Sequence, residues 1–294
     1  MRRDEVDSPG SPSPLIVLSS RLLWSLPVAE AAEAAATLGF QGLEIWTEHL
    51  WREGSPSELK EQLARLPLRY FLHAPFMDLN LCSRNARVAQ LPLAEQLRAL
   101  ELARDLEISL VVVHPGRCSS SKDSPEEYWP PLLEALGVLE SKAGKLEITV
   151  AVENMEPRPK EFMVRPIDFT RLLEELPGLG LCLDLAHAAA AGDGVPDEFI
   201  LELGEHIRHI HVSNVEEGRV HLPLDRGRLP ITSTVARFIR GFTGAVTLEG
   251  ATESGLKAAQ VGLGRLQELV KGGGDGDKPG VPSGRNPPIQ GGTS

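Results

Sequence analysis

The sequence predicts one closed barrel of eight parallel strands and eight helices, the (β/α)8 fold. Short apolar runs, many rich in β-branched residues, alternate with helix-length segments along the middle of the chain, and this alternation is typical of a parallel sheet covered by helices. The chain has 294 residues, enough for one barrel of about 250 residues with tails. Several apolar runs also stop on a polar side chain, at the strand ends where such barrels place their working residues.

The expected strands are short segments rich in Leu, Ile and Val. We expect them to be parallel, because a helix-length segment follows each one and a parallel connection needs such a crossover. In chain order they lie at residues 15–18, 43–46, 70–73, 110–114, 149–153, 181–184, 207–211 and 245–249.

The expected helices fill the intervals between these strands. The first is rich in alanine and should end before Gly39, since glycine commonly ends a helix. The third has apolar residues at helical spacing. In chain order the helices are expected at residues 28–38, 56–66, 93–106, 127–145, 167–176, 199–203, 232–242 and 255–269.

The two ends of the chain differ in composition from its middle. Residues 1–14 are charged and then rich in Ser and Pro, and residues 271–294 consist mainly of Gly, Pro, Asp and Ser. Such segments have too little apolar surface to fold. We therefore expect disordered tails on either side of one barrel domain at residues 15–270.

Composition restricts the cellular setting and the partners. The net charge of −11 works against nonspecific attraction to nucleic acid or to an anionic membrane. No uninterrupted apolar stretch reaches membrane-spanning length. The cysteines Cys82, Cys118 and Cys182 are odd in number and lack CxxC spacing, which disfavours a disulfide framework or a zinc knuckle. A reduced, cytoplasmic protein is expected, with Cys182 as a buried thiol.

Six of the expected strands stop on a side chain that can bind a metal. Because parallel strands bring their carboxyl ends to the same end of the barrel, we expect these side chains to converge. They are His73, His114, Glu153, Asp184, His211 and Glu249.

The carboxylates among these residues determine the expected chemistry. Glu153, Asp184 and Glu249, together with His211, form an oxygen-rich set suited to Mn²⁺, Mg²⁺ or Co²⁺ and acceptable to Zn²⁺. One such glutamate alone could equally cap a helix or form a salt bridge. Three carboxylates at a buried strand end would repel one another and become protonated without a cation. The sequence therefore predicts a divalent metal site.

The histidines leave more than one interpretation open. His73 and His114 could hold a second metal or donate hydrogen bonds to substrate oxygens. His209 should line the barrel one layer below His211. His49 and His206 are expected in solvent.

A series of short motifs, in this order and spacing, resembles the xylose isomerase-like TIM barrels. That superfamily includes sugar and sugar-phosphate isomerases and epimerases, and also the endonuclease IV type of apurinic endonuclease. The resemblance covers roughly residues 15–270, and together the motifs are specific. They are His73-Ala74-Pro75-Phe76, His114-Pro115-Gly116, Glu153-Asn154, Cys182-Leu183-Asp184-Leu185-Ala186-His187, His211-Val212-Ser213-Asn214, His221-Leu222-Pro223-Leu224 and Leu248-Glu249.

The resemblance implies two different site plans. In the ketose 3-epimerase type, one divalent ion is held by residues that match Glu153, Asp184, His211 and Glu249, and a histidine that matches His187 contacts the substrate. All of these residues are present.

In the endonuclease type, three zinc ions are held, and residues matching His73 and His114 are further ligands. The third ion takes residues matching His187 and His221 and an aspartate two residues before the latter. That place is occupied here by Arg219. A guanidinium cannot ligate a cation and would repel it, so the three-metal plan is broken there.

Binding to DNA is the main alternative. Phe76 could act as a wedge beside a flipped-out abasic nucleotide. Scattered solvated charges are the simpler interpretation of the basic residues in a chain this acidic, although Arg158 and Lys160 could also bind a sugar phosphate. The basic residues that could contact phosphate are Arg84, Arg87, Arg158, Lys160 and Arg165.

The carboxylate set and the resemblance together predict a divalent-metal-dependent isomerase or epimerase that acts on a small sugar or sugar phosphate through an enediolate. Glu153 and Glu249 are the expected proton-transfer groups. Trp46 and Phe76 would form an apolar wall for the substrate, and His187, Arg219 and His221 would bind its polar groups. The alternatives are an endonuclease IV-like zinc phosphodiesterase and a catalytically silent barrel of the same superfamily.

Overall fold

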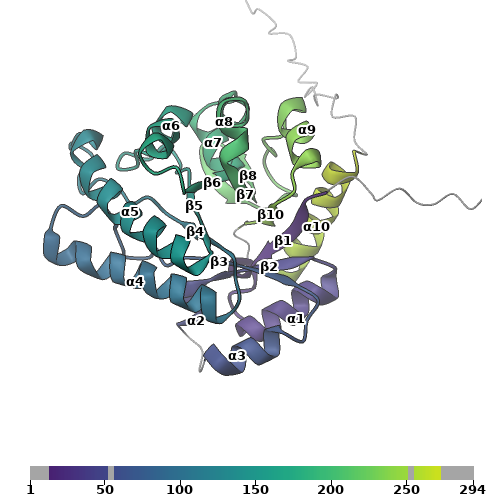
Figure 1. The fold of residues 1–294 in the computed structure, drawn as a ribbon. Coiled ribbons are helices and arrows are strands. Elements are labelled where there is room, and N and C mark those ends of the chain that lie inside the picture. Colours follow the sequence, from purple (N-terminus) through teal and green to yellow (C-terminus); the bar gives the residue numbers. More distant parts are fainter. Residues whose placement is uncertain (1–12, 52–55, 251–254, 273–294) are drawn as a thin grey trace, which may run out of the picture.

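The structure, a computed structural model, describes residues 13–51, 56–250 and 255–272. It confirms the predicted (β/α)8 barrel (Figure 1). The eight strands close in the order β1-β10-β7-β6-β5-β4-β3-β2, and every pair in the barrel is parallel. The strands are β1 Leu15–Ser19, β2 Gly42–Trp46, β3 Arg69–His73, β4 Leu110–Val113, β5 Thr149–Glu153, β6 Gly180–Asp184, β7 Ile207–Val212 and β10 Ala245–Leu248.

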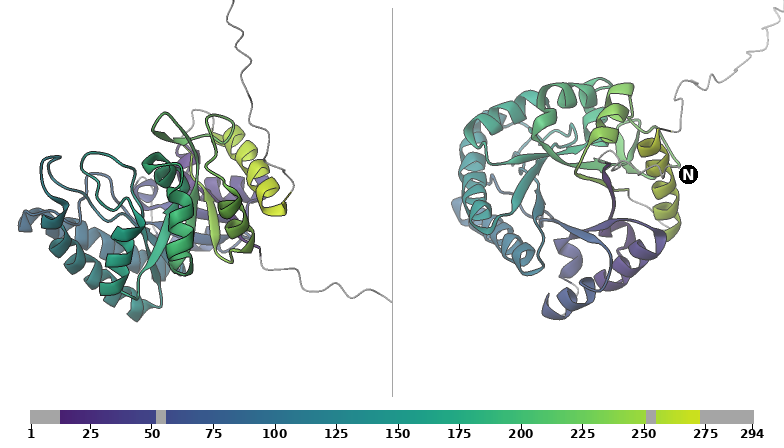
Figure 2. Two further views of the ribbon diagram at one scale, coloured as in Figure 1. Left: turned by 90° about the horizontal axis from the view of Figure 1, so that it is seen from above. Right: turned by 45° about the vertical axis from the view of Figure 1, so that its right-hand side comes forward.

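The helices form a ring around the strands, as the right-hand view of Figure 2 shows. The first helix ends where the sequence predicts: Gly39 adopts a φ of 97°, and its N–H donates to the carbonyl oxygens of Ala35 and Ala36. Glycine has no Cβ to oppose this left-handed conformation. The helices are α1 Val28–Leu38, α2 Thr47–Leu50, α3 Pro56–Leu63, α4 Ala86–Asp105, α5 Trp129–Leu146, α6 Pro166–Glu175, α7 Leu185–Ala191, α8 Val195–Leu203, α9 Ser233–Gly241 and α10 Gly255–Lys271, with 3-10 turns at Ser20–Leu23, Pro125–Glu127 and Gly204–His206.

Some elements differ from the prediction. Helix α4 begins well before residue 93, because Asn85 caps it by accepting from the Arg87 N–H and because the buried Pro92 is accommodated inside the helix. The short helix α7 was not predicted. Nor was the hairpin of β8 (Asn214–Glu216) and β9 (Arg219–Leu222), which follows β7. Its turn residues Glu217 and Gly218 both have positive φ, as tight hairpin turns require.

The core has two layers. A large apolar cluster fills the space between the strands and the surrounding helices. A smaller one fills the barrel itself and consists of Val17, Phe71, Leu110, Val112, Ala151, Cys182 and Ala245, with Leu15 packed against it. Because side chains alternate along a strand, the inward positions two residues beyond Phe71, Ala151 and Cys182 are His73, Glu153 and Asp184. The barrel therefore has an apolar floor below a polar upper layer.

Other sequence expectations concern the tails and the thiols. The predicted tails lie outside the described residues, apart from residues 13–14 and 271–272. Cys82, Cys118 and Cys182 are buried and unpaired. In the part of the chain that the structure describes, no helix combines the length and hydrophobicity needed to cross a membrane.

Candidate active site and metal centre

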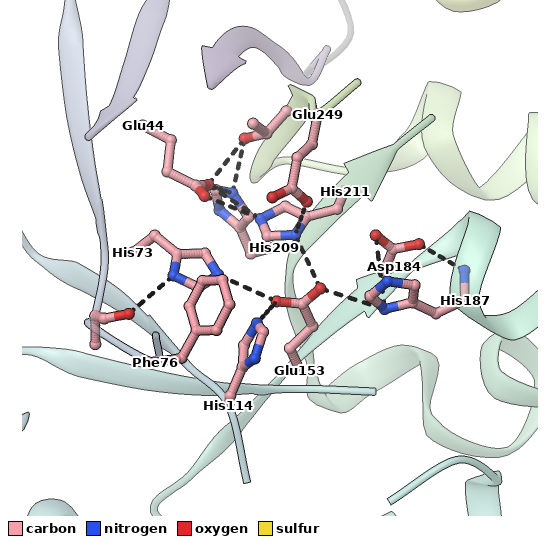
Figure 3. A network of polar contacts seen from close by, with 12 residues as sticks. Glu44, His73, Phe76, His114, Glu153, Asp184, His187, His209, His211 and Glu249 are labelled. Atoms are coloured by element: carbon pink, nitrogen blue, oxygen red, sulfur yellow. Dashed lines mark hydrogen bonds and ion pairs between the residues drawn. The ribbon is translucent and has the colours of Figure 1, made fainter. Parts of the chain in front are cut away.

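The six predicted strand-end residues converge at the carboxyl end of the barrel (Figure 3). Three of them, His73, Glu153 and Asp184, are the last residues of their strands, and His211 is the last but one of β7. The other two, His114 and Glu249, directly follow β4 and β10. Except for His114, which is half-buried, all are buried. Strand pairing sets their positions, since Asp184 pairs with His211 and His211 pairs with Thr247.

Glu153 lies at the centre of this group. Its Oε2 lies 3.4 Å from His73 Nε2 and 3.2 Å from His114 Nε2. Its Oε1 lies 3.3 Å from His211 Nδ1 and 3.5 Å from His187 Nδ1. Burial opposes ionisation, but His211 and His114 outweigh it and hold the Glu153 pKa well below its usual value. The carboxylate is therefore ionised and able to bind a cation.

Four residues offer ligand atoms to one point in space. One atom from each of Glu153, Asp184, His211 and Glu249 lies within 4.8 Å of the others. Three of these residues have a buried atom with no hydrogen-bond partner among the described residues: Asp184 Oδ2, His211 Nδ1 and Glu249 Oε2. Buried polar atoms in proteins are nearly always paired, and a bound divalent cation would pair these three. The donor set therefore fits a metal ion.

Protonated His211 balances negative charge of the carboxylates around this point. Burial opposes protonation of His211, but Cys182, Glu249 and Glu44 raise its pKa well above the usual value. Burial raises the pKa of Asp184. For Glu249, His211 outweighs the opposing effect of burial and lowers the pKa. A divalent ion would take over the positive charge that protonated histidine supplies here.

Asp184 is held rigidly by its neighbours. Its Oδ1 accepts from the His187 N–H at 2.7 Å and caps α7. The Asn154 side chain accepts from the Asp184 N–H at 2.7 Å and donates to the Asp184 carbonyl oxygen at 3.1 Å. Sequence reasoning did not single out Asn154, although the Glu-Asn pair was part of the motif series. This clamp leaves Asp184 Oδ2 directed to the common point.

Two further histidines face each other beside Asp184. His187 Nδ1 donates to the Asn154 carbonyl oxygen at 2.8 Å, and His187 Nε2 lies 3.0 Å from His221 Nε2. His221 comes from the hairpin and has a φ of 58°, an uncommon conformation for a residue other than glycine. Arg219 is exposed and its guanidinium lies 3.3 Å from the Glu216 carboxylate. The structure thus brings His187 and His221 together and leaves Arg219 at the rim.

An aromatic wall flanks the site. The Phe76 ring stacks on His114 with centroids 4.1 Å apart, and Trp46 lies edge-on to Phe76 at 5.2 Å. Glu48 fixes this wall, because its Oε1 accepts from the backbone N–H groups of Phe76 and Met77 at 2.7 and 3.1 Å. Glu48 is buried and was missed by sequence reasoning.

Four groups of three described residues could also hold metal, and two of them share His211 with the set above: Glu44, His209 and His211, and Glu153, Cys182 and His211. His73, His114 and Glu153 place ligand atoms within 4.8 Å of one another, as do Asp184, His187 and His221. In these last two groups, the spacing is compatible with both roles that the sequence leaves open for the histidines, metal binding and substrate binding.

Two histidine predictions have clear outcomes. His209 is fully buried and lines the barrel as expected. The prediction that His49 lies in solvent is wrong: it is buried, its Nε2 donates to the Leu26 carbonyl oxygen at 2.7 Å, and its ring packs on Trp24. Helix α2 turns this side chain inward directly after β2. His206 is half-buried.

Glu44 is the most prominent residue that sequence reasoning missed. It lies within β2, is fully buried and contacts both His209 and His211. The available signal was an acidic residue inside an otherwise apolar strand.

Known proteins with similar sequences include uncharacterized proteins and probable endonuclease 4 proteins. The chain is 25% identical to the uncharacterized protein MJ1188 of Methanocaldococcus jannaschii, over 80% of this chain and 87% of that protein. It is also 30% identical to a probable endonuclease 4 of Mycobacterium marinum, over 49% of this chain and 55% of that protein.

Solved structures with the same fold include sugar epimerases. A D-tagatose 3-epimerase-like protein superposes with a TM-score of 0.75 and 25% identity, covering 88% of this chain and 98% of that one. A D-psicose 3-epimerase has a TM-score of 0.73 at 17% identity, covering 87% and 99%. The family model described as xylose isomerase-like TIM barrel matches residues 32–269. The chain therefore belongs to the xylose isomerase-like TIM barrel family.

Proposed function

We propose that this protein is a divalent-metal-dependent isomerase or epimerase of a small sugar or sugar phosphate. The observation that carries the proposal is the set of buried ligand atoms on Asp184, His211 and Glu249 that have no hydrogen-bond partner among the described residues and converge beside Glu153. The similarity to a D-tagatose 3-epimerase-like protein over 88% of the chain supports the same class of substrate.

Glu153, Asp184, His211 and Glu249 would hold the ion. Their oxygen-rich composition suits Mn²⁺, Co²⁺ or Mg²⁺ and accepts Zn²⁺. When bound, such an ion polarises a substrate carbonyl and stabilises the negative charge of an enediolate.

Glu153 and Glu249 are the proposed proton-transfer groups. Glu153 Oε1 and Glu249 Oε2 lie 3.3 and 2.8 Å from His211 Nδ1, so both carboxylates border the same point. The nearby histidines hold the pKa of each carboxyl below its usual value, which keeps both ionised and able to accept a proton at neutral pH. One carboxylate would remove the proton next to the substrate carbonyl, and the other, after taking up a proton from solvent, would give it to the neighbouring carbon or to the opposite face.

The remaining residues would bind and orient the substrate. Trp46 and Phe76 offer an apolar wall to the C–H face of a sugar. His187 and His221 offer ring nitrogens on the opposite side. Arg219, at the rim, would contact the distal end of the substrate.

The test begins with metal-loaded protein. Purified protein should be stripped of metal, reloaded separately with Mn²⁺, Co²⁺, Mg²⁺ or Zn²⁺, and incubated with free and phosphorylated ketoses. We expect a new isomer or epimer with at least one ion and none with the stripped protein. Absence of turnover across the panel, with loaded metal verified, would count against the proposal and favour a catalytically silent barrel.

A second candidate is an endonuclease IV-like phosphodiesterase. It is favoured by the 30% identity to a probable endonuclease 4 and by the groups His73-His114-Glu153 and Asp184-His187-His221, which could hold further metal ions. Arg219 in place of a carboxylate opposes it. Incision of duplex DNA containing an abasic site, abolished by Glu249→Gln, would place this candidate first.

A further inference from the structure

Glu44 lies directly beneath the proposed metal centre. The residue belongs to β2, where it pairs in register with Ser19 and Phe71. Its side chain is fully buried inside the barrel and points toward His209 and His211 (Figure 3). It is not part of the four-residue group that could hold the ion beside Glu153 and Glu249, although with His209 and His211 it forms a separate buried group of three that could hold one.

The Glu44 carboxylate accepts hydrogen bonds from three side chains. His209 Nε2 lies 2.5 Å from Glu44 Oε2, His211 Nε2 lies 3.1 Å from it, and the Thr247 hydroxyl donates to it at 3.2 Å. An ionised carboxylate only accepts hydrogen bonds. At distances of 2.5 and 3.1 Å from this acceptor, both histidines donate from Nε2.

This arrangement decides which nitrogen of His211 is available to a metal. A neutral imidazole has one N–H and one lone pair. If the proton is on Nε2, the lone pair is on Nδ1. His211 Nδ1 is buried without a hydrogen-bond partner among the described residues, and it faces Glu153 and Glu249.

We propose that Glu44 is a positioning residue that holds His211 in its Nε2–H form, so that Nδ1 is presented to the ion. This inference rests on the proposed metal-dependent function. A buried charge that only filled space would be costly compared with an apolar side chain. A carboxylate that orients a ligand histidine explains why the charge lies at this place.

The test compares metal affinity in matched variants. Dissociation constants for Zn²⁺ and Mn²⁺ should be measured by chelator competition in wild type, Glu44→Gln and the control Glu48→Gln. Glu48 is also a buried carboxylate, but its hydrogen bonds are to the backbone of Phe76 and Met77. Because loss of such a partner typically costs about 10–100-fold in affinity, we expect about that loss in Glu44→Gln and none in Glu48→Gln. Equal affinity in wild type and Glu44→Gln would overturn the inference.

A second measurement has its decisive readout in the wild-type protein. Long-range ¹H–¹⁵N NMR of ¹⁵N-histidine-labelled, Zn²⁺-loaded wild type reports which ring nitrogen carries the proton, with His211 assigned by its loss in His211→Asn. We expect the proton on Nε2 and a metal-shifted Nδ1, and in Glu44→Gln a changed His211 pattern. A proton on Nδ1 in Zn²⁺-loaded wild type would refute the role of Glu44, because Nδ1 would then have no lone pair for the ion, whereas metal binding by the protein itself would stand. Wild type that binds no metal would refute both the proposed function and this inference.

Discussion

His211 Nδ1 lies 2.8 Å from Glu249 Oε2, yet neither atom has a hydrogen-bond partner among the described residues. The two atoms are close without the geometry of a hydrogen bond. This is the expected arrangement of two ligands that point at a shared cation. Several consequences of this relationship can be measured.

Divalent metal should stabilise the fold. A ligand that binds only the native state contributes about 2.7 kcal/mol at 100 times its dissociation constant. We expect Mn²⁺, Co²⁺ or Zn²⁺ to raise the melting temperature of metal-stripped wild type, and to raise that of Asp184→Asn much less. The comparison can be made by differential scanning calorimetry. The same melting temperature with and without each ion would contradict the site.

Replacing either proposed proton-transfer group should affect turnover more than folding. Glu153→Gln and Glu249→Gln retain the side-chain volume but remove a negative charge and a basic oxygen. General acid–base groups contribute about 10² to 10⁴-fold, so we expect kcat to fall at least that far even in saturating metal. Glu205→Gln, at an exposed position, serves as the control. A Glu249→Gln enzyme with wild-type kcat would exclude a proton-transfer role for that residue.

Arg219→Asp should increase the amount of zinc bound per chain. The ring nitrogens of His187 and His221 already lie 3.0 Å apart, and a carboxylate on the same hairpin strand would remove a repelling charge and add a possible ligand. The control is Arg237→Asp, which makes the same charge change on α9. Elemental analysis would give the ratio. An unchanged zinc content would indicate that the two histidines face substrate only.

Metal-free protein should lose stability as the pH rises above neutrality. Burial opposes protonation of His73, but the hydrogen bond to Glu153 and the negative charges of Glu153, Glu44 and Glu249 together outweigh burial and raise the His73 pKa to about 9 from 6.5. A raised pKa in the folded state stabilises fully below about pH 6.5, and this stability is lost as the pH passes through about 9. Urea unfolding in chelator should show a loss of up to about 3 kcal/mol over that interval. His73→Asn should reduce the loss, and an equal loss in that variant would assign it to other groups.

Much of the fold could be predicted because the same apolar strand pattern is repeated along the chain. The run Leu110-Val111-Val112-Val113 and the runs like it indicate buried parallel strands, and the side chains at their ends share one end of the barrel by geometry alone. For this reason the strand pattern by itself is enough to place Glu153, Asp184 and His211 near each other.

The residues that were missed depend on information that a short sequence window lacks. Glu44 lies in an apolar run where the strand pattern does not indicate which face is inside, and only closure of the barrel brings it to His209 and His211. Glu48 and His49 follow β2 in the single-turn helix α2, whose inward direction is decided by packing. The hairpin that supplies His221 is too short for periodicity to reveal it.

Proton exchange with solvent tests the central claim most directly, namely that Glu153 and Glu249 move a proton at a metal-bound substrate. A ketose or ketose phosphate that the metal-loaded protein converts should be incubated in deuterated water and followed by NMR. We expect deuterium at the carbon where the configuration or carbonyl changes, and much slower conversion to the product in Glu153→Gln and in Glu249→Gln. Conversion by wild type without any deuterium uptake would indicate internal hydride transfer and would contradict the proton-transfer role of both glutamates.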